Sequence, residues 1–246
     1  MSKIFILGDN HGRFNKIIQT VIAERPDAVI SVGDIMGDKN IRPLEQELKQ
    51  ILPLTEFWWI PGNHDTDSDA AYDGLFGSAL AECNFSGRVV TIAGLRVAGL
   101  GGVFRGKVWM PPADAVYESE KDFLRRSGKG NRWRGGLARL HRSTIFPDTY
   151  HRLVRERADL LITHEAPSCH PHGFAAIDEL ARTLGVRTAF HGHHHDCLDY
   201  SQSRDKLGFH AFGVGLRGIT DSHGTVIVPG ELDEQRRFRQ PQSNPS

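Results

Sequence analysis

One nine-residue stretch of the sequence passes directly from an apolar run into a polar cluster: Phe57-Trp58-Trp59-Ile60-Pro61-Gly62-Asn63-His64-Asp65. The same order occurs twice upstream. There Ile4–Leu7 precedes Gly8-Asp9-Asn10-His11, and Ala28–Val32 precedes Gly33-Asp34. Short apolar runs bounded by turn residues are typical of buried strands. Each stretch therefore predicts a buried strand followed by a polar loop.

Apolar residues recur at helical spacing in both gaps between these strands. They are Phe14, Ile17, Ile18, Val21 and Ile22 before Pro26, and Leu44, Leu48, Ile51 and Leu52 before Pro53. The order strand, helix, strand, helix, strand is the signature of a parallel sheet with helical crossovers. Ligands of such sheets lie beyond the carboxyl ends of the strands, which is where the polar clusters fall.

The second half of the chain also contains strands that end in polar residues. The predicted elements are hairpins over 89–100 and 210–228, helices over 148–157 and 174–184, and strands over 160–162 and 189–190. The last two strands run into Thr163-His164-Glu165 and into His191-Gly192-His193-His194-His195. Alternate residues of an extended segment point the same way, so we expect His193 and His195 to share a face while His194 points aside. We interpret His170, His172, His191 and His210 as hydrogen-bonded bystanders.

Composition narrows the class of protein. The chain has 246 residues, a length that predicts one to two domains, and its 39% hydrophobic and 24% charged residues are ordinary for a globular protein. Lys plus Arg equals Asp plus Glu at 30 each, which argues against a general polyanion binder. Three cysteines without C-x-x-C spacing argue against a disulfide scaffold and a zinc ribbon. With neither a signal-peptide core nor a run of 18 apolar residues, we expect a cytoplasmic protein without membrane association.

The polar clusters supply residue types that bind metals. They contain Asp9, His11, Asp34, Asn63, His164, His193 and His195. Because the carboxyl ends of parallel strands meet at one edge, we expect these side chains in one pocket. Imidazole with carboxylate suits Mn, Fe, Ni or Zn, and the lack of nearby thiolates argues against structural zinc. Seven ligands are too many for one metal with an open position, so they predict two metals of the kind that clamp an in-line displacement at phosphorus.

The order Asp-x-His, Gly-Asp, Gly-Asn-His-Asp, His, Gly-His-x-His resembles the calcineurin-like metallophosphoesterase superfamily, over residues 1 to about 228. The resemblance implies an α/β fold, a four-layer αββα sandwich of two mixed β-sheets flanked by helices. It implies that one metal is held by Asp9, His11, Asp34 and His195. The second would be held by Asp34, Asn63, His164 and His193, so that Asp34 bridges. It further implies hydrolysis of phosphate mono- or diesters by a metal-bridging hydroxide, with two divalent ions, Mn before Ni, Fe or Zn.

The resemblance places His64 just outside the metals. Among the residues of its block, His64 is the one imidazole left free to protonate a leaving alkoxide, and Asp65 is a candidate partner to orient it. Asn63 and Arg13 are candidate substrate-binding residues, although Arg13 fits a solvated helix start equally well. The expected substrate is a phosphorylated small molecule, protein or nucleotide.

The domain is predicted to cover residues 1–230, with a basic insertion at about 105–157 and a polar C-terminal tail over 231–246. The insertion contains 13 Lys or Arg and 6 Asp or Glu, interleaved with Trp109, Tyr117 and Trp133. Cations with stacking aromatics favour nucleic acid, so a nuclease or RNA-processing phosphodiesterase is one alternative. The insertion fits a solvated surface with locally paired arginines equally well. A non-catalytic scaffold on the same fold is a further alternative, which the complete set of ligand residues disfavours.

Overall fold

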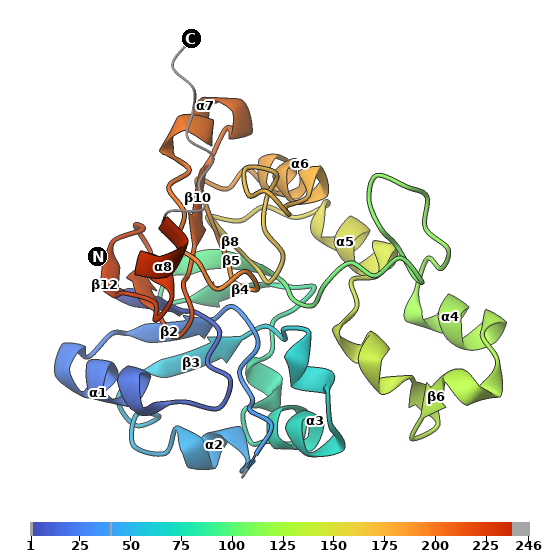
Figure 1. Ribbon diagram of the computed structural model, residues 1–246, viewed down its shortest axis with the longest axis horizontal. Coiled ribbons are helices and arrows are strands. Elements are labelled where there is room, and N and C mark those ends of the chain that lie inside the picture. The colour runs from blue at the N-terminus through green and yellow to red at the C-terminus, as the bar shows by residue number, and fades with distance from the viewer. Residues whose placement is uncertain (1, 40, 238–246) are drawn as a thin grey trace.

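The computed structural model describes residues 2–39 and 41–237. Two five-stranded sheets pack against each other, and helices cover their outer faces (Figure 1). The strand orders are β12-β11-β1-β2-β3 in the first sheet and β10-β9-β8-β5-β4 in the second. Both sheets contain parallel and antiparallel pairs. The predicted αββα sandwich of two mixed sheets is confirmed.

The first sheet is built on the three strands expected from the N-terminal third. They are β1 (Ile4–Leu7), β2 (Ala28–Ser31) and β3 (Glu56–Trp59), all parallel. Every residue of β1 and β2 is buried, because helices cover one face of this sheet and the second sheet covers the other. The crossover helices are α1 (Asn15–Glu24) and the short α2 (Leu44–Glu47). The helix expected over residues 44–52 therefore ends early, in turns that still bury Leu48 and Ile51.

The second sheet carries β4 (Val89–Ile92), β5 (Leu95–Leu100), β8 (Leu160–Thr163) and β9 (Thr188–His191). The hairpin β4–β5 was expected, and β8 and β9 extend it in parallel. Helices α5 (Pro147–Leu153) and α6 (Ala175–Leu184) pack on this sheet through a shared apolar core. Helix α6 ends at Gly185, whose φ of 73° is the left-handed conformation that glycine adopts without strain.

The predicted hairpin over residues 210–228 is wrong. Strand β10 (His210–Gly213) pairs with β9 in the second sheet, whereas β11 (Ile219–Asp221) pairs with β1 in the first. The hairpin is formed by β11 and β12 (Val226–Val228) alone. The chain thus crosses between the sheets at this point, since an alternating pattern predicts a strand but not its partner.

The basic insertion projects from the side of the sandwich next to α3 (Asp69–Phe76) (Figure 1). It contains α4 (Glu120–Arg126), the two-stranded ribbon β6 (Arg132–Trp133) and β7 (Gly136–Leu137), and a 3₁₀ segment, Arg139–Ser143. A small core of Val108, Phe123, Leu137 and Phe146 holds it together. Helix α5 lies within the range 105–157 predicted for the insertion, but its buried residues belong to the core of the second sheet.

Remaining short elements are the 3₁₀ turns His64–Thr66, Ala81–Cys83, Lys129–Asn131 and Ser201–Ser203, and the helices α7 (Arg204–Leu207) and α8 (Asp233–Arg237). Glu231 and Asp233, expected in a polar tail, contact the domain. Glu231 forms ion pairs with Lys16 and Arg217, and the buried Asp233 accepts a hydrogen bond from the Gly230 amide. The rest of that tail, 238–246, lies outside the described residues. Within the part described, no helix is long and apolar enough to cross a membrane.

Candidate metal centre

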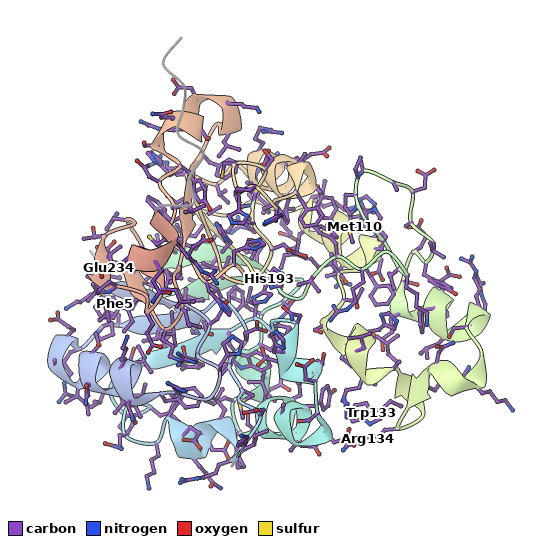
Figure 2. All side chains as sticks on the ribbon, in the orientation of Figure 1. Phe5, Met110, Trp133, Arg134, His193 and Glu234 are labelled. Carbon is purple, nitrogen blue, oxygen red and sulfur yellow. The ribbon has the colours of Figure 1, made fainter. Side chains whose placement is uncertain are left out.

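The polar clusters after β1, β2, β3, β8 and β9 meet at one rim of the sandwich. His193, from the loop after β9, lies near the middle of the molecule in Figure 2. All seven residues that the sequence singled out as metal ligands are brought together there by contacts between loops far apart in the chain. They form two groups.

The first group consists of Asp9, His11, Asp34 and His195. One ligand atom from each lies within 4.8 Å of the corresponding atoms of the others. The Nε2 atoms of His11 and His195 are 3.1 Å apart, and His195 Nε2 is 3.2 Å from Asp9 Oδ2. This is the set of side chains that the resemblance assigned to one metal.

The second group consists of Asp34, His164 and His193, again with ligand atoms within 4.8 Å of one another. His164 Nε2 lies 3.4 Å from Asp34 Oδ2 and 3.1 Å from the side-chain oxygen of Asn63. Asp34 is thus shared by the two groups, and Asn63 borders the second. The geometry matches the expected division of ligands, with Asp34 between the two positions.

The donor atoms fit two divalent cations. Asp9 Oδ1 and Asp34 Oδ2 are buried and have no hydrogen-bond partner among the described residues. Burying such atoms without a partner costs free energy, which a cation between them offsets. His164 Nδ1 lies 2.8 Å from the carbonyl oxygen of Val32, so its N–H donates there, and Nε2 faces Asp34 and Asn63. Carboxylates with imidazoles are the ligands of Mn, Fe, Ni and Zn.

The buried Asp34 and His164 shift each other's pKa. Burial acts to raise the pKa of Asp34, but the adjacent His164 outweighs it and holds that pKa below its usual range. Burial likewise acts to lower the pKa of His164, yet Asp34 and Asp9 raise it to about 10. Because metals bind neutral imidazole, a cation at the second group must compete with the proton on His164.

The ligand loops adopt an unusual backbone conformation. His11, Asp34, His193 and His195 have φ values of 46°, 47°, 69° and 57°. Non-glycine residues seldom occupy this region, and those that do cluster at functional sites. His193 and His195 therefore face the same pocket because of a turn and not through the strand alternation that we expected. His194 does point aside, with its ring stacked on that of His170 at a centroid distance of 3.8 Å.

Two glycines let the loops approach the carboxylates. A Cβ atom on Gly62 would lie 2.2 Å from Asp34 Oδ1, and one on Gly192 would lie 2.4 Å from Asp9 Oδ1. Real side chains do not tolerate such distances. The glycines in the Gly-Asn-His-Asp and Gly-His-x-His blocks are therefore required by the packing of the centre.

His64 stands beside both groups. Its amide donates to Asp34 Oδ1 at 2.8 Å, and its ring is edge-on to His11 at a centroid distance of 5.5 Å. The ring Nδ1 lies 2.5 Å from Asp67 Oδ2. Burial acts to lower the pKa of His64, but the hydrogen bond to Asp67 and the charge of Asp34 raise it above its usual value. A half-exposed imidazole whose second ring nitrogen is held by a carboxylate has the geometry of a proton donor.

Asp65 does not orient His64, and that prediction is wrong. Its carboxylate is buried and accepts hydrogen bonds from the amides of Ile35, Met36 and Gly62 at 2.8–2.9 Å. Asp65 therefore joins the loops after β2 and β3. The orienting partner is Asp67, because the 3₁₀ turn His64–Thr66 places residues three apart side by side.

Arg13 and Arg105, two candidate phosphate-binding residues, differ in their surroundings. Arg13 is exposed, and its guanidinium has no hydrogen bond or ion pair among the described residues. Arg105, which the sequence pattern placed only in the insertion, is partly buried and donates to the Ser143 carbonyl oxygen at 3.0 Å. It interacts electrostatically with Asp34, Asp67 and Glu165, although burial lowers its pKa. Arg105 follows the carboxyl end of β5, which lies at the same rim, and this position in the sequence could have indicated that Arg105 lies near the candidate metal groups.

A cavity of about 410 Å³ adjoins the metal groups. Its lining residues are His11, Met36, Gly37, Asp38, His64, Asp67, Ser68 and Ala71. The volume is in the range of sites for small ligands. A leaving group in this space would lie next to the His64 ring.

Several arginines of the insertion and its three aromatic side chains Trp109, Tyr117 and Trp133 make contacts within the protein. Arg134 pairs with Asp69 and Asp73 of α3, and Trp133 packs edge-on against Tyr72. Figure 2 shows the labelled Trp133 and Arg134 on the side of the insertion that faces α3. Trp109 packs between Phe104 and Tyr150, and Tyr117 packs on Phe123 under Arg126. The expectation that these three aromatic residues form a stacking surface for bases is not supported by this packing.

Comparisons with known proteins agree with this architecture. Residues 2–197 match the family described as calcineurin-like phosphoesterase. An uncharacterized protein of Haemophilus influenzae Rd is 37% identical over 233 residues, covering 95% of this chain and all of that protein. The crystal structure of TT1561 from Thermus thermophilus has a TM-score of 0.55 at 13% identity, covering 94% of this chain and 99% of the other. Another crystal structure reaches 0.57 at 15% identity, with 93% and 98% covered. The chain belongs to the calcineurin-like phosphoesterase family, the class that its fold and its Asp/His clusters define.

Proposed function

We propose that the protein is a binuclear metal-dependent phosphoesterase that hydrolyses phosphate mono- or diesters of small molecules. The observation that carries this proposal is the pair of ligand groups sharing Asp34, with His64 and a cavity beside them. We assign the first metal to Asp9, His11, Asp34 and His195, and the second to Asp34, Asn63, His164 and His193. Manganese is the expected metal, with Ni, Fe or Zn as alternatives.

Two divalent ions, when bound, supply positive charge at the phosphoryl oxygens and lower the pKa of water. The side chains of the protein bind the substrate and transfer the proton. A water molecule that has given one proton to the solvent forms the new bond to phosphorus through its oxygen, while the bond between phosphorus and the leaving oxygen breaks. That oxygen keeps the electron pair and takes a proton from the His64 ring, whose Nδ1 is held by Asp67. Arg105, together with the expected candidates Asn63 and Arg13, is suited to bind phosphoryl oxygens.

A phosphodiesterase acting on nucleic acid is a second candidate. It is supported by the excess of basic residues in the insertion. However, Arg125, Arg126, Arg134 and Arg139 of the insertion pair with acidic side chains, which weakens the electrostatic argument for a polyanionic substrate. The small-molecule substrate is therefore the proposal that we favour.

A panel of metals and substrates tests the proposal. The protein is stripped with a chelator, reloaded with Mn, Ni, Fe, Zn or Mg, and assayed on p-nitrophenyl phosphate, bis-p-nitrophenyl phosphate, cyclic nucleotides and oligonucleotides. We expect hydrolysis that is lost on chelation and restored best by Mn. Hydrolysis that survives complete metal removal would contradict the two-metal mechanism. Cleavage restricted to oligonucleotides, with binding that weakens as salt rises, would favour the nuclease.

A further inference from the structure

The turn that carries His64 is held from two directions. On the metal side, the His64 amide donates to Asp34, and the Asp65 carboxylate ties the turn to the loops after β2 and β3. On the opposite side, the 3₁₀ segment Arg139–Ser143 of the insertion packs on the turn. Ser143 Oγ lies 2.7 Å from Thr66 Oγ1. The insertion is therefore in direct contact with the element that positions the proposed proton donor.

Arg139 makes the main contacts. Its Nε donates to the carbonyl oxygen of Thr66 at 3.0 Å, and its Nη2 donates to the carbonyl oxygen of Asp67 at 2.8 Å. Its remaining Nη1 bonds to the carboxylate of Asp69, at the start of α3. A planar guanidinium can donate in three directions at once with a fixed geometry, which a lysine ammonium on a flexible chain cannot reproduce.

These contacts reach the His64 ring through one residue. Asp67 presents its carbonyl oxygen to Arg139 and its carboxylate to His64 Nδ1. Holding the Asp67 backbone thus holds the partner of the imidazole. A displacement of about 1 Å in such a group can cost on the order of 10²-fold in rate.

We propose that Arg139 is a positioning residue for the proton transfer assigned to His64, so that the basic insertion governs the chemical step of the reaction. The inference rests on the proposed function. Arg134 offers a matched control, because it also joins the insertion to α3 through Asp69 and Asp73 but does not contact the turn.

The test compares Arg139→Ala, Arg139→Lys and Arg134→Ala in the full-length, metal-loaded protein. Arg139→Ala should lower kcat by about 10- to 10²-fold with little change in KM, since substrate binding is left intact. The loss should be larger for alkyl phosphates than for p-nitrophenyl phosphate, whose leaving group departs without a proton. Added guanidinium ion should restore part of the activity. Arg139→Lys should recover only part of the rate, and Arg134→Ala should remain close to the unmodified protein.

Hydrogen exchange gives a readout that does not depend on turnover. The Asp67 amide donates to the His64 carbonyl oxygen at 3.1 Å within the turn. Arg139→Ala should speed exchange at this amide, whereas Arg134→Ala should not. The metal content, measured by elemental analysis, should stay the same in all variants.

Three results would overturn the inference. One is an equal loss of rate in Arg139→Ala and Arg134→Ala, and another is a loss that does not depend on the leaving group; both leave the phosphoesterase assignment intact. If Arg139→Ala does not fold, the leaving-group dependence of Arg139→Lys tests the inference by the same criterion. The third, an unmodified protein without metal-dependent hydrolysis, would remove the proposed function and this inference together.

Discussion

At the scale of single residues, the centre depends on which partner each side chain finds. Asp34 touches both ligand groups, while Asp65, next to His64 in sequence, turns inward to three backbone amides. His64 is instead partnered by Asp67. Neighbouring acidic residues of one short segment therefore have different partners: Asp65 joins loops, and Asp67 contacts the ring of His64, the proposed proton donor.

Replacing His64 tests the proton donor. His64→Ala should keep the fold and both metals but lose about 10²- to 10⁴-fold in kcat, the usual contribution of a positioned general acid. The loss should shrink for p-nitrophenyl phosphate and grow for alkyl phosphates. Steady-state kinetics over a series of leaving groups measures this. A loss of the same size across the series would contradict the proton-donor role and point to phosphate binding.

At the scale of elements, the loops after the strands form the centre because glycines allow them to meet. Gly62 follows β3 and packs against the Asp34 carboxylate and amide. Strain in these loops is also visible in the left-handed φ values of the ligand residues His11, Asp34, His193 and His195.

A single added methyl group tests this packing. Gly62→Ala should impair metal binding at both groups, because the new Cβ would lie 2.2 Å from Asp34 Oδ1 and 2.3 Å from the Asp34 amide nitrogen. Gly128→Ala, where the added atom meets nothing within 4 Å, is the matched control. Elemental analysis and metal titration measure the difference. Full metal content in Gly62→Ala would show that the loops adjust freely.

The insertion also contributes a pH-dependent element. His141 is buried on Phe123, and burial, together with the cations Lys107 and Arg105, lowers its pKa to about 4. Between pH 6.5 and about 4 the unfolded chain therefore binds a proton at His141 that the folded chain does not. The contribution of neutral, buried His141 to the free energy of unfolding is therefore complete above about pH 6.5 and is lost as the pH falls towards about 4.

His141→Gln should remove this part of the pH dependence. The free energy of unfolding, measured in urea at several pH values from about 7 to about 4, should fall less steeply in the variant than in the unmodified protein. His223→Gln, at an exposed turn, serves as the control and should keep the original slope. Identical slopes in all three proteins would contradict a buried, neutral His141.

At the scale of the whole molecule, the two sheets converge on the candidate metal centre. The loops after β1 and β2 of one sheet face those after β8 and β9 of the other across buried carboxylates. A cation that binds only the folded chain therefore couples the two halves of the sandwich. One site at about 100 times its Kd adds about 2.7 kcal/mol to the free energy of unfolding.

Metal removal should therefore lower stability as well as activity. Chelation should reduce Tm, and returning Mn should restore it in a concentration-dependent way. Asp34→Asn should lose most of this response, because it removes the charge shared by both groups. His64→Ala and the surface variant Asp114→Asn should retain it. Calorimetry with and without metal measures these shifts, and a Tm insensitive to metal would argue against the assigned ligands.

Much of this organisation can be predicted from local sequence. Strands β1, β2 and β3 and the hairpin β4–β5 were expected, as was the convergence of all seven candidate ligands. This succeeds because each candidate ligand lies within a few residues of the end of an apolar run, so the strand ends already bring these loops to one rim.

Other features follow only from contacts between distant segments. Local patterns do not specify which strand another strand pairs with, so the crossing from β10 to β11 was missed. Local patterns also do not show that the 3₁₀ turn places Asp67, and not Asp65, beside the His64 ring. Nor do they show that Arg139 contacts Asp67 across a separation of 72 residues. Such pairings depend on free energy gained when both partners are already placed by the packed core. Polar residues at the predicted strand ends therefore indicate which side chains gather at the candidate centre, whereas tertiary packing determines which groups orient them.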